Sequence, residues 1–247
     1  WAKPETDWKE DRLYKMIHRY QPEAMIINNT GLSARGAFGA DEIDAVTYER
    51  GKPARRDLRG RKKYVAAEMC QTLCDSWGIA DDIHFKPVRQ LIEELCICRR
   101  EGANFLLNIG PYADGGVSTM QKGIMECIGR WMSSFGEAIY NGRPYLSYAD
   151  KPEFFLQSVS DPDLLYLFCF DPQQTDGNKH VTLDFEEDHQ NVPVFDGFMR
   201  KIERISWLDN NEALSFIQKE DKVKIDFTGF PYGQNLCVRV ARVQLKP

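Results

Sequence analysis

The sequence predicts a chain in two parts, a parallel α/β part followed by an antiparallel β-sandwich. Over residues 1–148, segments with helical periodicity alternate with short apolar runs, and repeated strand–helix units of this kind favour a parallel sheet. Over residues 149–247, the apolar runs are separated by turn-forming clusters, which is typical of a small sandwich. We therefore expect a domain boundary between residues 148 and 149.

Length and composition restrict the class of protein. The chain has 247 residues, of which 43% are hydrophobic and 28% charged, as expected for one or two globular domains. Its apolar runs fall far short of the roughly 20 residues of a membrane-spanning helix, so no membrane partner is expected. The net charge is −5, so no global basic field would hold nucleic acid. The basic run at residues 55–63 lacks interleaved aromatic residues, and we expect a solvated loop or a subunit contact there.

The first elements follow in order along the α/β part. Residues 7–20 place apolar residues on one helical face, and Pro22 ends this helix. Residues 24–28 form a nearly all-apolar run, as expected of a parallel strand buried on both faces. A long loop rich in glycine and charge follows, and residues 64–72 are the second strand candidate.

The alternation of helix and strand continues to the end of this part. The pattern of residues 87–100 predicts a helix that stops at Gly102. Residues 105–109 are the third predicted buried strand, and residues 118–135 are predicted to form an amphipathic helix. In the second part, residues 223–227 alternate between apolar and charged side chains, the period of a half-buried strand. Further strands are expected at residues 154–159, 164–170, 181–185 and 236–245.

The α/β part is too short for a closed (β/α)8 barrel. A complete barrel takes about 250 residues, whereas residues 1–148 suffice for roughly four or five units of about 30 residues. The fold is therefore either a smaller open sheet or the C-terminal portion of a TIM-like (β/α) barrel from a longer enzyme. The chain begins with Trp1 instead of methionine, which favours the second interpretation. No signal peptide is visible in residues 1–17, and because the chain does not begin with methionine, this end does not indicate the compartment.

The seven cysteines give no sign of a metal site. Their number is odd, most have apolar neighbours, and Cys70/Cys74 and Cys96/Cys98 lack C-x-x-C spacing. The four histidines lie far apart in the sequence. We therefore expect reduced thiols, no metal and no cofactor, and reduced thiols would suit a cytoplasmic location.

Polar residues gather at the predicted strand ends and in the loops that follow them. In parallel α/β architectures, sites form at this edge of the sheet. Two carboxylates beside an exposed tryptophan suit a sugar site, because the aromatic face packs on a pyranose while carboxylates do acid/base work. Composition alone also allows each carboxylate to be an ordinary solvated loop acid or a buried hydrogen-bond acceptor. The residues in question are Asn28, Asn29, Glu49, Glu68, Trp77 and Asn108.

Three segments of the α/β part resemble a known enzyme family. The tripeptide SWG at residues 76–78, the run GANFLLNIGPYADG at residues 102–115, and the run IGRWMSSFGEAIY at residues 128–140 are similar to the family 29 glycoside hydrolases, the α-L-fucosidases. The resemblance extends weakly over residues 1–150, and a β-sandwich follows the catalytic domain in that family as well.

The resemblance implies a retaining glycosidase that removes terminal α-L-fucose from glycans. In such enzymes an Asp nucleophile attacks the anomeric carbon, and a Glu acts first as acid and then as base. The matching Asp would fall immediately before Trp1, so this chain alone is expected to lack it. Asp7 is not expected to replace it, because Asp7 lies at a helix start, where aspartate commonly caps.

The resemblance also assigns roles to individual residues. Glu49 is the expected acid/base, because it ends the segment DAVTYE. Trp77 matches the aromatic that packs against the fucose ring, and Glu68 matches the carboxylate of a W-E motif. Asn28 opens the segment N-N-T where the family has N-D-R, so Arg35 is expected to replace the substrate-contacting arginine.

Two classes of function stay open. The chain is either the portion of an α-L-fucosidase downstream of the nucleophile or a non-catalytic carbohydrate-binding or structural fragment. The expected partner is a fucosylated glycan. Half a barrel exposes apolar strand edges, so we also expect a homo-oligomer or association with the N-terminal barrel segment.

Overall fold

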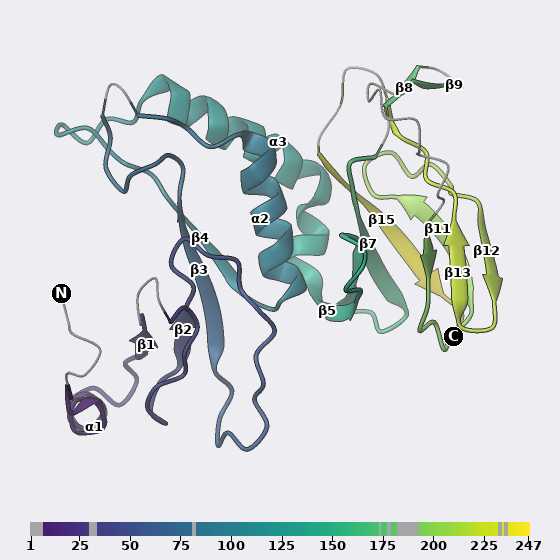
Figure 1. The fold of residues 1–247 in the computed structure, drawn as a ribbon. Coiled ribbons are helices and arrows are strands. Elements are labelled where there is room, and N and C mark those ends of the chain that lie inside the picture. Colours follow the sequence, from purple (N-terminus) through teal and green to yellow (C-terminus); the bar gives the residue numbers. More distant parts are fainter. Residues whose placement is uncertain are drawn as a thin grey trace. The chain divides into compact units, whose positions relative to one another are not determined.

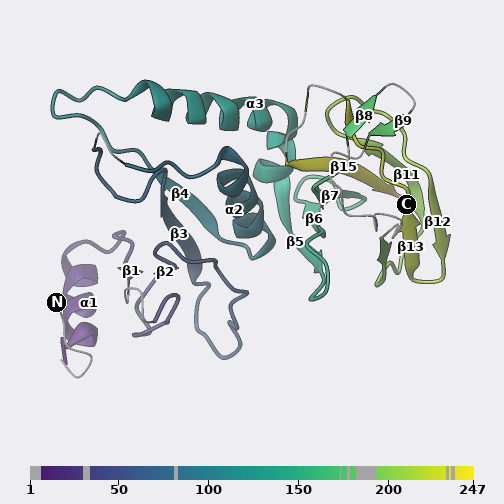
Figure 2. The ribbon, with the colours of Figure 1, turned by 45° about the horizontal axis from the view of Figure 1, so that its top comes forward.

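The computed structural model describes residues 7–29, 34–80, 83–172, 174–176, 179–181, 193–231, 234 and 237–247. The chain forms two compact units that interleave along the sequence (Figures 1 and 2). Unit 1 comprises Trp1–Phe85 and Glu101–Pro111, and unit 2 comprises Lys86–Arg100 and Tyr112–Pro247. The expected domain boundary between residues 148 and 149 stays a prediction.

Unit 1 is built on a parallel sheet of four strands in the order β1-β2-β3-β4. Neighbours in the sheet are also neighbours in the sequence, and every pair is parallel, which confirms the expected parallel α/β part. Helix α1 precedes the sheet. The elements are α1 (Glu10–Tyr20), β1 (Ile27–Asn28), β2 (Ala45–Thr47), β3 (Ala66–Thr72) and β4 (Asn104–Asn108).

Three details of this sheet differ from the expectations. Strand β2 lies within the segment expected to be a loop, because a run of three residues is too short to show a period. Strand β1 is not buried on both faces, since Ile27 is 51% exposed. Strand β4 is not fully buried either, as the 50% exposure of Leu106 shows. Strand β4 is the last strand of the described sheet and has a neighbour on one side only.

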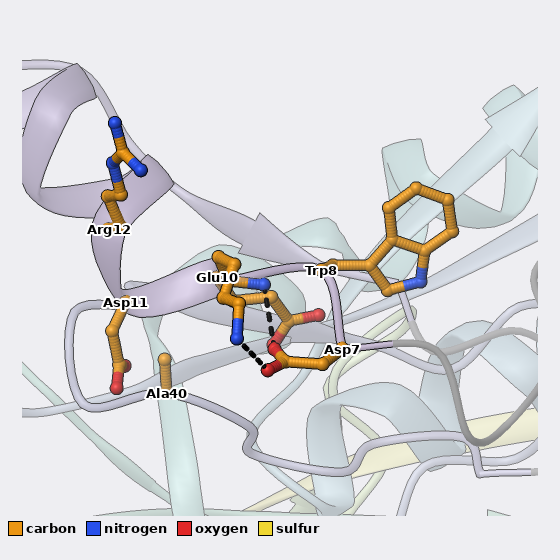
Figure 3. A pocket seen from close by; sticks show the side chains of 7 residues that line it. Asp7, Trp8, Glu10, Asp11, Arg12 and Ala40 are labelled. Carbon is orange, nitrogen blue, oxygen red and sulfur yellow. Dashed lines mark hydrogen bonds and ion pairs between the residues drawn. The ribbon is translucent and has the colours of Figure 1, made fainter.

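Helix α1 forms where its periodicity predicts, but Asp7 does not cap it. The N-cap residue is Lys9, with a left-handed backbone (φ 53°) and no capping side chain. The Asp7 carboxylate instead accepts a hydrogen bond of 2.9 Å from the backbone amide of Lys9, the residue directly before the first helical residue (Figure 3). The helix buries none of its residues in the described structure.

The basic run at residues 55–63 forms a loop braced by its own arginines. Arg56 donates to the carbonyls of Val65 and Gly102 at 3.0 Å each. The guanidinium of Arg61 lies 4.2 Å from the centre of the Phe38 ring. At least part of this run therefore supports the fold of unit 1.

Unit 2 is centred on a five-stranded antiparallel sheet with both faces covered. Its order is β11-β15-β7-β6-β5. Helices α2 and α3 cover one face, and a three-stranded antiparallel sheet, β10-β13-β12, covers the other (Figure 1). The bounds are α2 (Val88–Arg100), α3 (Thr119–Asn141), β5 (Gly142–Ser147), β6 (Phe154–Ser158), β7 (Leu164–Phe170), β10 (Val194–Phe195), β11 (Ile202–Trp207), β12 (Phe216–Lys219), β13 (Lys222–Ile225) and β15 (Val238–Leu245). A small third sheet holds β8 (Gln174–Asp176), β9 (Lys179–Val181) and β14 (Phe230–Pro231).

Strands β6 and β7 are nearly all apolar because successive side chains enter different cores. Phe155 and Leu167 face the three-stranded sheet, whereas Phe154 and Phe168 face the helices. The expected alternation in β13 is confirmed, with Val223 and Ile225 buried between exposed lysines. Antiparallel sheets therefore follow the parallel part as predicted. The strand expected at residues 181–185 lies almost wholly outside the described residues.

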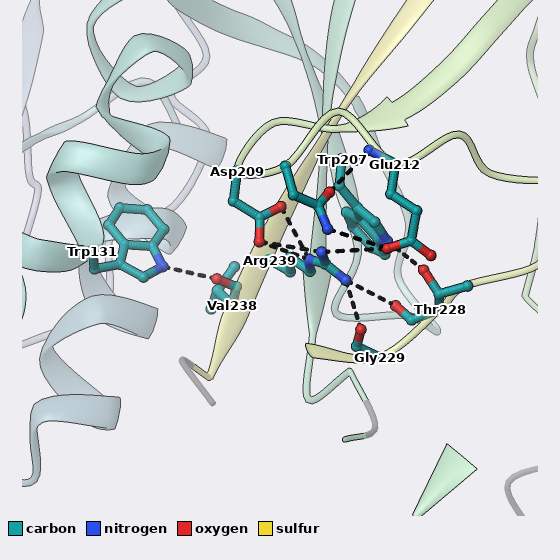
Figure 4. Close-up of polar contacts among 9 residues, drawn as sticks. Trp131, Trp207, Asp209, Glu212, Thr228, Gly229, Val238 and Arg239 are labelled. Carbon is teal, nitrogen blue, oxygen red and sulfur yellow. Dashed lines mark hydrogen bonds and ion pairs between the residues drawn. The ribbon is translucent and has the colours of Figure 1, made fainter. Parts of the chain in front are cut away.

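A buried arginine interrupts the apolar run of β15. The Arg239 side chain has no exposed surface, and its guanidinium pairs with Asp209, donates to the Gly229 carbonyl at 2.7 Å and lies 4.3 Å from the Trp207 ring centre (Figure 4). These partners compensate the loss of water around the charge. Nearby, the indole of Trp131 on α3 donates to the Val238 carbonyl at 2.8 Å and fixes the helix to the sheet.

All seven cysteines are free thiols in the structure. Among the helices of the described residues, none has the length and apolar character needed to span a membrane.

Candidate active site

The strand register of unit 1 places two carboxylates on one face of the parallel sheet. Thr47 of β2 lies opposite Glu68 of β3, and Glu68 lies opposite Asn104 of β4. The ladder continues past β2, where the Arg50 amide donates to the Cys70 carbonyl at 2.8 Å. Because side chains alternate along a strand, Glu49 projects from the same face as Glu68, one step closer to the carboxyl edge of the sheet.

Each carboxylate accepts a hydrogen bond from an asparagine of a neighbouring strand. Asn29, directly after β1, donates its side-chain amide to Glu49 Oε2 at 3.0 Å. Asn104 of β4 donates to Glu68 Oε2 at 2.8 Å. Both glutamates are half-buried, so the two charges keep some contact with solvent.

Cys70 is close to both glutamates, since it follows Glu68 by two residues on β3 and its carbonyl accepts from the amide of Arg50, the residue after Glu49. Burial raises the pKa of the Cys70 thiol, and the negative charges of Glu49 and Glu68 raise it further. Both carboxylates are therefore close enough to Cys70 for their charges to raise the pKa of its thiol. An uncharged Cys70 adds no negative charge to this part of the sheet face.

Trp77 lies in the loop after β3 and is held by the loop after β4. Its side chain is 40% exposed, and its carbonyl accepts a hydrogen bond of 2.8 Å from the Asn108 side chain. The two loops also touch directly, because a Cβ on Gly110 would lie 2.6 Å from the backbone of Gly78. The exposed indole therefore stands on a fixed backbone at the carboxyl edge of the sheet.

Arg35 reaches the end of β2 without touching the Glu49 carboxylate. Its Nε donates to the Glu49 backbone carbonyl at 2.5 Å. Its side chain lies so close to Gly51 that a Cβ on this glycine would clash with Arg35 Cδ. The structure thus brings Arg35 to the segment that carries Glu49, as a support of its backbone.

Asn28 lies apart from this group. It alternates with Ile27 and Asn29, so its side chain is on the opposite face of the sheet, where it is 7% exposed and donates to the Ala37 carbonyl at 3.1 Å. The neighbour of Glu49 is Asn29 instead. Asn29 is one of the polar residues that the sequence places at the strand ends, but its pairing with Glu49, like the pairing of Asn104 with Glu68, depends on the register between strands.

A separate hollow lies at the start of α1 and contains none of the expected site residues. Figure 3 shows its labelled side chains, with Trp8 to one side of the acidic residues. Its lining residues are Asp7, Trp8, Lys9, Glu10, Asp11, Arg12 and Ala40. In the part of the chain that the structure describes, no group of three or more histidine, cysteine or acidic side chains is arranged to hold a metal ion.

Unit 1 thus combines a parallel sheet with two carboxylates on one of its faces, and antiparallel sheets follow in unit 2. The fold is shared with α-L-fucosidase isoenzyme 1 of Paenibacillus thiaminolyticus, with a TM-score of 0.72 at 19% identity over 100% of this chain and 56% of that chain. A GH29 α-L-fucosidase of Bacteroides thetaiotaomicron gives a TM-score of 0.67 at 17% identity over 97% of this chain and 53% of that chain.

The sequence comparisons reach the same family. The α-L-fucosidase family profile matches residues 1–137, and the tissue α-L-fucosidase of Mus musculus is 34% identical over 88 residues, which are 34% of this chain and 20% of that protein. The chain belongs to the α-L-fucosidase family. It spans about half the length of the solved structures that share its fold.

Proposed function

We propose that this chain carries the acid/base and substrate-binding residues of a retaining α-L-fucosidase that removes terminal fucose from glycans. The observation that carries the proposal is the placement of Glu49 and Glu68 on one face of the sheet, with Glu49 just past the end of β2 and Glu68 on the adjacent strand β3. A structure of the Bacteroides relative is described as a trapped covalent intermediate with 2-fluoro-fucosyl fluoride, which supports a retaining reaction on a fucosyl group.

Each residue has a distinct role in this reaction. Glu49 gives its proton to the leaving-group oxygen as the glycosidic bond breaks and then takes a proton from the water that releases fucose. Glu68 accepts hydrogen bonds from sugar hydroxyls. Trp77 offers its exposed face to the fucose ring, and Arg35 steadies the backbone at Glu49.

The nucleophile comes from outside residues 1–247. An Asp on a further strand attacks the anomeric carbon, and in a retaining enzyme its carboxyl lies about 5 Å from that of the acid/base. The same polypeptide segment covers the apolar side chains Ile27 and Leu106, which are about half exposed on the sheet face. We therefore expect a homo-oligomer only where this segment is lacking.

Hydrolysis of an aryl α-L-fucoside tests this function. The 247-residue chain is compared with a version extended upstream through the strand that carries the nucleophile, and with the extended version in which that Asp is replaced by Asn. Activity in the extended version only, lost in the Asp→Asn variant, supports the proposal.

Two other outcomes of this experiment would contradict the proposal. Activity in the 247-residue chain would mean that the nucleophile lies within it. No activity in either version, together with fucose binding by calorimetry, would favour a non-catalytic carbohydrate-binding fragment.

A further inference from the structure

The hydrogen bond between Asn104 and Glu68 joins two residues that strand register makes direct neighbours. Glu68 lies near the middle of β3, and Asn104 opens β4 at the opposing position. The Asn104 amide donates to Oε2 of the carboxylate at 2.8 Å. Among the described residues, Glu68 has no other side-chain partner, so Oε1 is left without one.

The chemistry of the partner matters for what Glu68 can do. An amide donor fixes one carboxylate oxygen but brings no positive charge, so the carboxylate keeps its full strength as an acceptor. A lysine or arginine in the same place would neutralise it. The second pair on this face, Asn29 with Glu49, uses the same chemistry, again without a cation on the carboxylate among the described residues.

The bond is not needed to hold the sheet together. Strands β3 and β4 are already paired along five residues from Glu68 to Thr72, and Asn104 is exposed to solvent. An exposed polar pair of this kind contributes little to folding stability. A role in placing the carboxylate explains the bond better than a role in stability.

We propose that Asn104 is a positioning residue: it holds Glu68 by Oε2 so that Oε1 is presented to a hydroxyl group of the bound sugar. This inference rests on the proposed function. Without the amide, Glu68 would sample several side-chain rotamers, and the sugar would have to order it on binding. Removing the Asn104 amide should therefore lower kcat/KM for fucoside hydrolysis. This loss should occur only when Glu68 is present.

A double-mutant cycle in the extended, active chain tests this pathway. Asn104→Leu keeps the size of the side chain and removes the donor, and Glu68→Ala removes the acceptor. We expect Asn104→Leu to lower kcat/KM roughly tenfold to hundredfold in the wild-type background, because a misplaced carboxylate loses its productive geometry with the sugar. In the Glu68→Ala background the same substitution should change kcat/KM by less than about twofold.

A matched control separates positioning from a general effect. Asn210 in unit 2 donates to the Glu212 carboxylate at 3.3 Å and accepts from the Glu212 amide at 2.9 Å, so Asn210→Leu removes another asparagine–glutamate pair, far from the site in sequence, and should leave kcat/KM unchanged. Urea unfolding should show similar free energies of unfolding for the wild type and Asn104→Leu.

Equal losses from Asn104→Leu in both backgrounds would overturn the inference, as would a loss below about twofold in the wild type. If the extended wild type is inactive, the proposed function itself fails and this inference fails with it. The two failures are therefore distinguishable.

Discussion

Glu49 and Glu68 are the same residue type on the same sheet face, and their surroundings support the different roles that we propose for them. Glu49 stands past the end of β2, one step nearer the carboxyl edge, with a backbone carbonyl held by Arg35. Glu68 is set within β3 and is held by a strand neighbour. The edge position suits proton transfer to a leaving group, and the inner position suits a hydrogen bond to the sugar ring.

Replacing the acid/base should affect fucosides according to their leaving groups. In the extended chain, Glu49→Gln should lower the hydrolysis rate of fucosides with poor leaving groups by about 10²–10⁴-fold, because these need a proton from the enzyme. Fucosides with good leaving groups should lose far less in the step that breaks the glycosidic bond.

Steady-state and burst kinetics with both kinds of substrate measure this, with Glu68→Gln as the matched carboxylate replacement. Equal losses for both substrates would remove Glu49 from the role. A leaving-group dependence in Glu68→Gln instead would transfer the role to Glu68.

Trp77 should contribute mainly to sugar binding. Trp77→Ala removes an exposed aromatic face, and a loss of about 1 kcal/mol corresponds to a roughly fivefold weaker Kd for fucose. Titration calorimetry in the extended chain checks this, with Tyr140→Ala on α3 as the control, since Tyr140 is 81% exposed and lies in unit 2. An unchanged Kd in Trp77→Ala would contradict the role.

The loops after β3 and β4 act together because Gly110 lets their backbones meet. The contact between Gly110 and Gly78 leaves no room for a side chain on Gly110, and the Asn108 amide then fixes the Trp77 carbonyl. The sequence motifs around Trp77 and Gly110 therefore describe one structural feature. Its consequence is a fixed position for the exposed indole.

A methyl group at one of these glycines should be far more costly than at the other. Gly110→Ala places a Cβ 2.6 Å from the Gly78 backbone and should lower the free energy of unfolding by about 1–3 kcal/mol. At Gly78, a Cβ would meet no atom within 4 Å, so Gly78→Ala is the matched control and should change stability little. Urea unfolding measures both variants, and equal effects would contradict the close contact.

Both units contain a carboxylate whose charged form the fold stabilises. Burial alone would raise the pKa of Asp44, but hydrogen bonds from the Ile26 amide and Lys63 lower it overall. In unit 2, burial would likewise raise the pKa of Glu137, but hydrogen bonds from Arg242 and Tyr166 lower it. The pKa of each group is thus lower in the folded than in the unfolded chain.

The molecule should consequently lose stability in acid. A carboxylate with a lowered pKa contributes stability above its unfolded value, near pH 4, and this contribution is lost as pH falls through the folded value. Asp44→Asn and Glu137→Gln should each lower the free energy of unfolding at pH 7 and flatten its decline below about pH 4.

Urea unfolding at pH 7, 4 and 3 measures this dependence. Glu220→Gln removes one exposed carboxylate and serves as the control for net charge. If the free energy of unfolding of both variants fell below pH 4 as steeply as that of the wild type, the lowered pKa values of Asp44 and Glu137 would not be its cause.

Periodicity and short sequence motifs predicted much of the secondary structure of this protein, and its family. The helices α1, α2 and α3, the strands β3, β7 and β13, and the change from parallel to antiparallel sheets follow from side-chain patterns that are local in the chain. The family follows from short motifs such as the one at residues 102–115. Local patterns carry this information because a helix or a strand is selected by its own neighbouring residues.

The sequence did not predict how the strands pair or in which register. Strand β2 is too short to show a period, and the exposure of Leu106 depends on β4 having a neighbour on one side only. The choice of Asn29 over Asn28 as the partner of Glu49, and the bond from Asn104 to Glu68, likewise follow from register. A shift of one residue turns every side chain of a strand to the other face, so these contacts exist only once the strands are paired.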